Sequence, residues 1–228
     1  MEDWLRRAAI DRPDHPFLIH PDGSITTFAE MERWVQALVG ALRRHGLGAG
    51  DRIAVAPRND ARSVARLFAI PRTGAASLIV NARLTPSEVT DRLAQAGAAA
   101  AFDGLAGLLD PCGGGAPDQS IVLGSARDHS ILFTSGSTGR PKAVRLTWGN
   151  LEASAAASAA VLEHSAADRW YAALPLFHVG GLSILIRSAR EQSAIYLEPS
   201  FDPLRAAQLL VDGDATLGSL VASMLRQV

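Results

Sequence analysis

The first clear pattern of apolar positions predicts a helix that follows a short hairpin. Apolar residues recur at helical spacing, and they are Phe28, Met31, Val35, Leu38, Val39 and Leu42. Thr27 and Glu30 have the spacing of a capping box at the start of this helix. Before it, the turn signal Pro21-Asp22-Gly23 separates two extended runs within residues 17–27. This stretch therefore predicts a β-hairpin followed by an amphipathic helix.

From residue 52 onward, short apolar runs alternate with helical patterns. Predicted strands cover residues 52–56, 76–80 and 98–102, and predicted helices cover residues 61–72 and 85–96. A strand–helix–strand–helix–strand order implies parallel strands joined by crossover helices. No Gly-x-Gly-x-x-Gly motif occurs at these turns, so nothing here supports a dinucleotide-binding fold.

A segment rich in Gly, Pro and Asp follows, and the alternation then resumes. Further strands are predicted at residues 130–134, 143–147, 170–174, 193–197 and 215–220, with helices starting near residues 150, 181 and 203. The expected fold class is α/β, with mainly parallel sheets and crossover helices. We expect a first α/β subdomain over residues 1–110, a Gly/Pro-rich loop over 111–128 and a second α/β subdomain over 129–228.

Composition excludes several classes of protein. The 228 residues include 22 Lys+Arg against 23 Asp+Glu, so the chain lacks the basic footprint of a nucleic-acid-binding protein. Hydrophobic residues make up 48% of the chain, yet no apolar run approaches the ~18 residues of a membrane span. The acidic N-terminus does not resemble a signal peptide, and the single cysteine, Cys112, cannot form an intrachain disulfide. We therefore expect a cytoplasmic protein, and homo-oligomerisation stays open.

The basic residues are distributed unevenly between the two cationic types. All but one are Arg, and the exception is Lys142. The excess of Ala and Arg indicates a coding bias that replaces Lys wherever Arg will serve. A Lys that survives this bias suggests a site that needs a compact ammonium rather than a planar guanidinium, although chance survival is the alternative.

This lysine ends a loop of small and hydroxylated residues between two apolar strands. The segment reads Thr134-Ser135-Gly136-Ser137-Thr138-Gly139-Arg140-Pro141-Lys142. Its glycines let backbone N–H groups converge on an anion, its hydroxyl groups add donors, and its lysine adds charge. These properties predict a polyphosphate-binding loop, with a flexible Ser/Gly turn as the alternative. A Walker A loop is disfavoured, because that motif places Gly-Lys-Ser/Thr at a helix start and here Pro141 precedes the lysine of a strand.

The same segment resembles the phosphate-binding signature of the adenylate-forming enzymes, which include acyl- and aryl-CoA ligases, luciferases and peptide-synthetase adenylation domains. Residues 25–31, 74–84 and 174–181 resemble further segments of that family in the same order, so the resemblance covers nearly the whole chain. Within the family, the likeness is greatest to the subgroup that acts on 2-succinylbenzoate in menaquinone synthesis. Lys-Ala at 142–143 and the stretch 217–225 carry this finer likeness.

The resemblance implies a two-step reaction. A carboxylate attacks the α-phosphate of ATP to give an acyl-adenylate and pyrophosphate, and the CoA thiolate then displaces AMP. The resemblance assigns the β- and γ-phosphates to Thr134, Ser135, Gly136, Ser137, Thr138 and Gly139, with Lys142 as a supporting cation. It also places Thr138 near Mg²⁺, and His178 and Gly180 beside the acyl group. From composition alone, His178 is more simply interpreted as a structural loop residue.

The chain also departs from the family. It lacks the Tyr-Gly-x-Thr-Glu segment whose Glu binds Mg²⁺, the Asp that holds the ribose, and the C-terminal domain with the catalytic Lys. Both subdomains would thus be parts of one truncated N-terminal domain that contains no catalytic residue. We expect the chain alone to form neither acyl-AMP nor acyl-CoA at a useful rate. A non-catalytic nucleotide- or phosphate-binding module and a ligase for another aryl or fatty acid are the alternatives.

Overall fold

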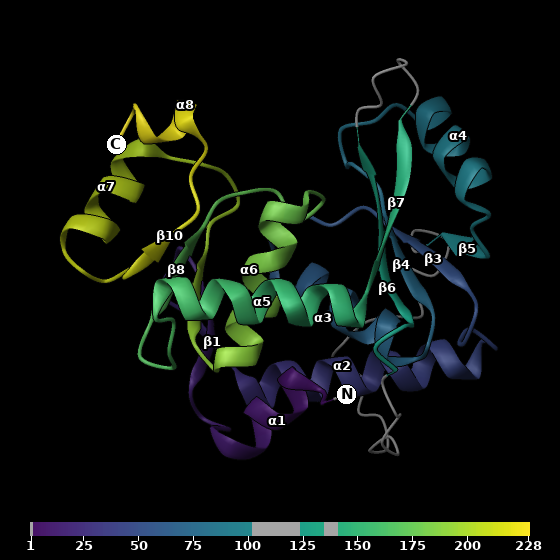
Figure 1. Ribbon diagram of the computed structural model, residues 1–228, viewed down its shortest axis with the longest axis horizontal. Coiled ribbons are helices and arrows are strands. Elements are labelled where there is room, and N and C mark those ends of the chain that lie inside the picture. Colours follow the sequence, from purple (N-terminus) through teal and green to yellow (C-terminus); the bar gives the residue numbers. More distant parts are fainter. Residues whose placement is uncertain (1, 102–123, 135–140) are drawn as a thin grey trace. The chain divides into compact units, whose positions relative to one another are not determined.

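The computed structural model describes residues 2–101, 124–134 and 141–228, which form two compact units (Figure 1). The first unit is built from the described residues of Arg33–Pro57 and Arg62–Glu152, with Glu2. The second unit is built from Asp3–Glu32, Arg58–Ala61 and Ala153–Val228. Each unit contains one five-stranded sheet in the described part of the chain.

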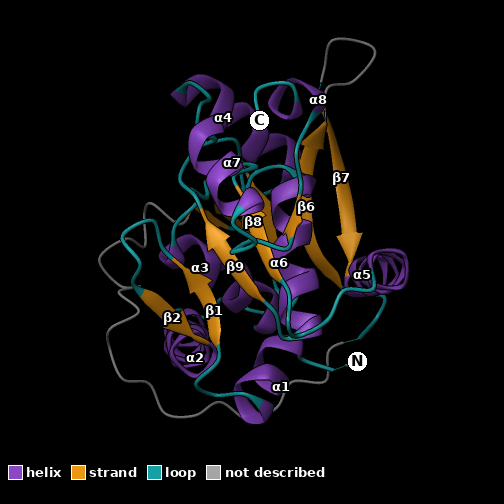
Figure 2. Cartoon of the chain, turned by 90° about the vertical axis from the view of Figure 1, so that its left-hand side faces the viewer, coloured by secondary structure: helices purple, strands orange, loops and turns teal. Residues whose placement is uncertain are grey.

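Helices and strands alternate along the described chain (Figure 2). The helices are α1 (Trp4–Asp11), α2 (Phe28–Arg44), α3 (Ala61–Arg72), α4 (Pro86–Ala96), α5 (Trp148–Leu162), α6 (Val179–Glu191), α7 (Pro203–Val211) and α8 (Ala222–Leu225). The strands are β1 (Pro16–Ile19), β2 (Ile25–Thr27), β3 (Arg52–Val55), β4 (Ala76–Ile79), β5 (Ala100–Ala101), β6 (Asp128–Thr134), β7 (Lys142–Thr147), β8 (Arg169–Ala172), β9 (Ala194–Leu197) and β10 (Leu217–Gly218). This alternation confirms the α/β class expected from the sequence.

The sheet of the first unit has the strand order β5-β3-β4-β6-β7. Parallel pairing joins β3 to β4 and β5, and β4 to β6, whereas β7 runs antiparallel to β6 at the edge. β4 is buried along its whole length, which is typical of a central strand in a parallel sheet. The parallel strands predicted between residues 52 and 102 are thereby confirmed.

The sheet of the second unit has the order β10-β8-β9-β1-β2. Strands β10, β8, β9 and β1 are joined by parallel pairs, and β2 pairs antiparallel with β1 as the predicted hairpin. The pair Leu18–Ile195 joins this N-terminal hairpin to a strand from the second half of the chain. Phe17 and Leu18 are fully buried as a result.

The two units differ from the linear division expected at residues 1–110, 111–128 and 129–228. β6 begins at Asp128, the last residue of the expected loop, and together with β7 it completes the first sheet. β1 and β2 precede the loop but complete the second sheet. The difference arises because strand pairing joins segments that are distant in sequence. The predicted loop falls largely on residues 102–123, outside the described residues, and its limits stay a prediction.

Two predicted helix starts have the expected capping boxes. At the start of α2, the Thr27 N–H donates to Glu30 Oε2 at 2.9 Å and the Glu30 N–H donates to Thr27 Oγ1 at 3.2 Å. Thr85 and Glu88 make the equivalent reciprocal bonds at the start of α4. This helix ends at Gly97, which has the left-handed conformation (φ 62°) that favours glycine.

Some element limits differ from the prediction, and α1 and α8 were not predicted. α6 begins at Val179 rather than residue 181, because the Leu182 N–H donates to the His178 carbonyl and closes the first turn earlier. α5 begins at Trp148, two residues before the predicted start near residue 150. The strand predicted over 215–220 shortens to β10, and the Ala215 N–H instead donates to a carbonyl near the end of α7. β5 is likewise shorter than predicted.

A buried histidine lies in β6, the strand that leads to the predicted phosphate loop. His129 is fully buried, its Nδ1 is hydrogen-bonded to the Ser130 hydroxyl, and its Nε2 has no hydrogen-bond partner in the described ranges. The ring packs edge-on against Trp148 with the ring centroids 4.6 Å apart. Burial disfavours the charged imidazolium and lowers the pKa of His129 to about 3.

We predict that this histidine makes the fold sensitive to acid. Its pKa is lower in the folded than in the unfolded chain, so the unfolded chain binds the extra proton and stability falls as the pH drops below about 6.5. Between pH 6.5 and pH 5 the loss from His129 amounts to about 1.6 kcal/mol of unfolding free energy. Urea unfolding at several pH values measures this free energy. In His129→Gln we expect the loss of unfolding free energy between pH 6.5 and pH 5 to be smaller by that amount. His45→Gln, at an exposed position, is the control, and equal slopes in wild type and His129→Gln would contradict the prediction.

Candidate functional site

The predicted phosphate loop connects the two strands of an antiparallel hairpin. Thr134, the last residue of β6, pairs directly with Lys142, the first residue of β7. The two ends of the loop are therefore held side by side, and Lys142 begins a strand rather than a helix. This confirms that the lysine belongs to a strand, which distinguishes the loop from a Walker A motif. The intervening residues Ser135, Gly136, Ser137, Thr138 and Gly139 lie outside the described residues, and their roles stay predictions.

Side chains of α4 contact the residues next to both ends of the loop, at the end of the hairpin where Thr134 pairs with Lys142. Gln95 Nε2 donates to the carbonyl oxygen of Pro141 at 2.9 Å, immediately before Lys142. The Arg92 guanidinium lies over the ring of Phe133, 5.5 Å from the ring centroid. Phe133 is the residue immediately before Thr134. Sequence reasoning missed Arg92 and Gln95, because a solvent-facing polar residue on a helix gives no signal of the distant strand it contacts. Thr134 and Lys142 themselves are exposed.

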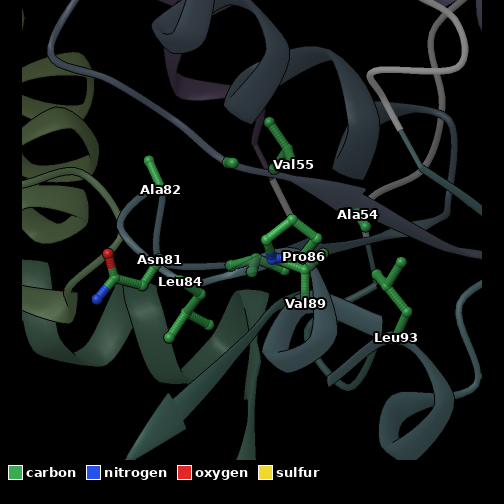
Figure 3. A pocket seen from close by; sticks show the side chains of 10 residues that line it. Ala54, Val55, Asn81, Ala82, Leu84, Pro86, Val89 and Leu93 are labelled. Atoms are coloured by element: carbon green, nitrogen blue, oxygen red, sulfur yellow. The ribbon is translucent and has the colours of Figure 1, made fainter. Parts of the chain in front are cut away.

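A cavity of about 380 Å³ opens at the carboxyl ends of β3 and β4 (Figure 3). It is lined by apolar side chains that include Val55, Val89 and Leu93, and Asn81 is the one polar residue among its described lining residues. Because β4 and β6 are parallel neighbours, this cavity lies at the same edge of the sheet as Thr134. Its lining suits an apolar group better than a phosphate, so phosphate contacts are expected from the hairpin loop instead.

The segment Asn81–Leu84 forms part of the cavity wall. Asn81, Ala82 and Leu84 line the cavity, and the Asn81 Oδ1 accepts the Arg83 N–H at 2.9 Å in a local turn. This segment belonged to the family likeness at the sequence level but had no assigned role. The structure places it between the end of β4 and the start of α4.

In the second unit, His178 lies at the start of α6, directly after the loop that follows β8. Its backbone is extended, its side chain makes no capping hydrogen bond, and the residue is exposed. The imidazole lies 4.6 Å from the Phe177 ring, measured between ring centroids. Gly180 lies in the first turn of α6, before the helix start predicted near residue 181. The substrate-binding roles of His178 and Gly180 stay predictions.

The first turn of α6 packs tightly on the loop before it. A Cβ added at Gly181 would overlap the carbonyl oxygen of Pro175 and lie 2.7 Å from that of Leu174. A Cβ added at Gly180 would instead meet only the end of the Leu174 side chain, at 3.1 Å. Gly181 is therefore needed for close backbone approach, a requirement that the sequence did not reveal.

The described residues contain no group of three or more His, Cys, Asp or Glu side chains that could hold a metal ion. Thr138, the residue expected near Mg²⁺, is outside those ranges. None of the helices described is both long enough and apolar enough to cross a membrane.

Comparison with known proteins gives one consistent family. The profile of the family described as AMP-binding enzyme matches residues 5–127 and 126–228. A 2-succinylbenzoate–CoA ligase of Geobacillus kaustophilus is 35% identical over 243 residues, which cover 100% of this chain and 49% of that protein. The corresponding ligase of Listeria innocua is 32% identical over 240 residues, covering 100% of this chain and 51% of that protein. The chain thus spans about half the length of the curated relatives it matches.

Solved structures give the same picture. An o-succinylbenzoate CoA synthetase from Bacillus subtilis, in complex with its acyl-adenylate intermediate, superposes with a TM-score of 0.88 at 26% identity, covering 99% of this chain and 63% of that chain. The same enzyme in complex with ATP and magnesium ion gives a TM-score of 0.88 over 99% of this chain and 50% of that one. A putative long-chain-fatty-acid CoA ligase from Rhodopseudomonas palustris reaches 0.85 at 26% identity, over 99% and 64% of the two chains.

We predict that the two neighbouring glycines of α6 respond differently to alanine. Gly181→Ala forces a Cβ against two backbone carbonyls and should lower the unfolding free energy by about 1–3 kcal/mol or more. Gly180→Ala is the matched control, because a flexible leucine terminus can move aside, and we expect a change below about 1 kcal/mol. Denaturant unfolding of both variants measures the difference. Equal losses in the two variants would show that the loop does not constrain the helix start.

Proposed function

The chain belongs to the family of AMP-binding enzymes, and we propose that it forms part of an ATP-dependent ligase that converts a carboxylate into its CoA thioester. The observation that carries this proposal is the hairpin of β6 and β7, which holds Thr134 opposite Lys142 at the two ends of a Gly/Ser/Thr loop. We propose 2-succinylbenzoate as the carboxylate. Support comes from the curated relatives, which are ligases for that acid and match the whole of this chain.

The proposed reaction has two steps. In the first, a carboxylate oxygen attacks the α-phosphorus of ATP, the bond to the bridging oxygen breaks, and pyrophosphate leaves with the acyl-adenylate as the other product. In the second, the CoA thiolate attacks the acyl carbon and AMP leaves. Side chains form no covalent bond to the reactants, so catalysis relies on positioning and on stabilising charge.

We propose that the loop holds the phosphates during the first step. Its backbone N–H groups and hydroxyls would surround the β- and γ-phosphates, from Thr134 to Gly139, and Lys142 would bring a compact positive charge to the far end. Because Thr134 and Lys142 pair across the hairpin, donors from both strands can face one anion. Mg²⁺ would neutralise phosphate charge, and Thr138 is the residue of this chain proposed to lie near it.

We further propose that His178 and Gly180 contact the acyl group. Support comes from the exposed position of His178 at the end of the loop after β8, because ligands of α/β sheets bind outside the carboxyl ends of the strands. The aromatic ring of Phe177 beside it would suit an aryl group. A cytoplasmic location, expected from the single cysteine, also stays a proposal.

A second candidate substrate class is a fatty acid. The favouring observation is the likeness to the Rhodopseudomonas palustris protein, whose name gives a long-chain fatty acid as substrate. A panel of carboxylates in an ATP–pyrophosphate exchange assay distinguishes the two, using the longest form of the protein that the gene encodes. Exchange that depends on 2-succinylbenzoate supports the main proposal, exchange with fatty acids supports the second, and nucleotide binding without any exchange contradicts both.

We predict that Lys142 contributes to adenylation. In the same longest form, Lys142→Ala should slow carboxylate-dependent pyrophosphate exchange roughly 10- to 150-fold, because it removes a charge-assisted hydrogen bond to phosphate. This change in rate corresponds to about 1.5–3 kcal/mol of activation free energy. Arg145→Ala is the matched control: it removes a cation from the same strand that is paired with Asp128 at 2.8 Å. We expect near-wild-type exchange in that control. Unchanged kinetics in Lys142→Ala would remove the support for a phosphate-binding role.

A further inference from the structure

One amide side chain ties together the segments that follow β8 and β9, and it comes from a distant part of the sequence. Asn59 Nδ2 donates to the carbonyl oxygen of Leu174 at 3.1 Å and to that of Glu198 at 2.9 Å. Asn59 Oδ1 accepts the Leu176 N–H at 3.1 Å. All four residues belong to the second unit, and Asn59 itself is only partly exposed.

These hydrogen bonds lie just beyond the end of the β8–β9 pairing. The pair of parallel strands β8 and β9 closes with the Glu198 N–H donating to the Ala172 carbonyl at 3.0 Å. The strand pairing ends there, and the Leu174 and Glu198 carbonyls are both bonded to the Asn59 amide instead. Asn59 therefore acts as one further cross-link between the two segments at the carboxyl edge of the sheet.

The hydrogen-bonding pattern requires an amide. Two N–H donors and one carbonyl acceptor are needed together, and among residues of this length only asparagine has them. Aspartate would keep an acceptor for the Leu176 N–H but would direct a carboxylate at two carbonyl oxygens. Leucine has a similar volume but would leave all three backbone groups without this partner, at a cost for each that is buried.

The cross-linked segment leads directly to His178. Leu176 is buried, and the His178 N–H donates to the Pro175 carbonyl at 3.0 Å, which closes a turn over the intervening residues. The Leu174 and Pro175 carbonyls also form the surface on which Gly181 packs. The backbone of His178 is thus fixed on one side by the start of α6 and on the other by the bonds to Asn59.

We propose that Asn59 is a positioning residue for His178: it holds the loop Leu174–His178 so that the imidazole keeps the place from which it would contact the carboxylate substrate. The role rests on the proposed function, because it is through His178 that Asn59 would affect the reaction. Asn59 does not belong to the phosphate hairpin, so its loss should affect the carboxylate and spare ATP.

The test compares two variants of Asn59 with a control in the same unit. Asn59→Leu removes all three bonds and Asn59→Asp reverses the two donor contacts. Thr216→Val is the control, since Thr216 Oγ1 donates to Asp168 at 2.7 Å and accepts the Arg169 N–H at 3.0 Å, away from the loop. In carboxylate-dependent pyrophosphate exchange with the longest encoded form, we expect both Asn59 variants to raise the KM for 2-succinylbenzoate about tenfold. The KM for ATP should change less than twofold, and Thr216→Val should change neither.

A second measurement does not depend on activity. With histidine labelled by ¹³C and ¹⁵N, the ring signals of His178 should shift in the Asn59 variants and stay in place in Thr216→Val. If no carboxylate supports exchange in the wild type, the proposed function fails, and these signals still decide whether Asn59 positions the loop. If exchange occurs but the Asn59 variants match Thr216→Val in both measurements, the positioning role is overturned. Should Asn59→Leu not fold, Asn59→Asp decides in the same way.

Discussion

Parallel strand pairing is the constraint on which both candidate ligand regions depend. In a parallel sheet all strands end at the same edge, so loops that are far apart in sequence emerge side by side. In the first unit, the pairing of β4 with β6 places the cavity beside β3 and β4 at the same edge as Thr134. In the second unit, the pairing of β8 with β9 places the loop to His178 beside Glu198. Each unit thus presents its candidate residues where its strands end.

Short-range features of the fold could be predicted because their causes are local. The capping boxes at Thr27 and Thr85 involve residues three positions apart, and the hairpin turn near Gly23 is fixed by three consecutive residues. The start of α1 has a local signal too, since Asp3 accepts the Arg6 N–H at 3.1 Å, but this helix is only 8 residues long. Long-range pairing, such as Leu18 with Ile195, left no periodic trace in the sequence.

The candidate site divides in the same way. The hairpin around the phosphate loop followed from Pro141 and the apolar strands on either side, and the pairing of Thr134 with Lys142 confirms it. The contacts that hold that hairpin and the His178 loop could not be found, because Gln95 and Asn59 act on backbone groups far along the chain. A polar side chain that bonds a distant carbonyl looks, in a sequence, like any exposed polar residue. The family likeness supplied the expected roles of individual loop residues, which no local pattern could assign and which stay predictions.

The pairing of β1 with β9 also has a consequence for the order in which the chain is made. At roughly 5–20 residues per second, the N-terminal hairpin leaves the ribosome roughly 10 to 35 seconds before its parallel partner. Throughout that interval Phe17 and Leu18, which are fully buried in the finished unit, lack the strand that joins them to the sheet. The nascent second unit therefore exposes an unpaired strand edge and apolar surface during this interval. Both features favour aggregation, and chaperones bind such surfaces. The time for which this edge stays unpaired therefore lengthens as translation slows.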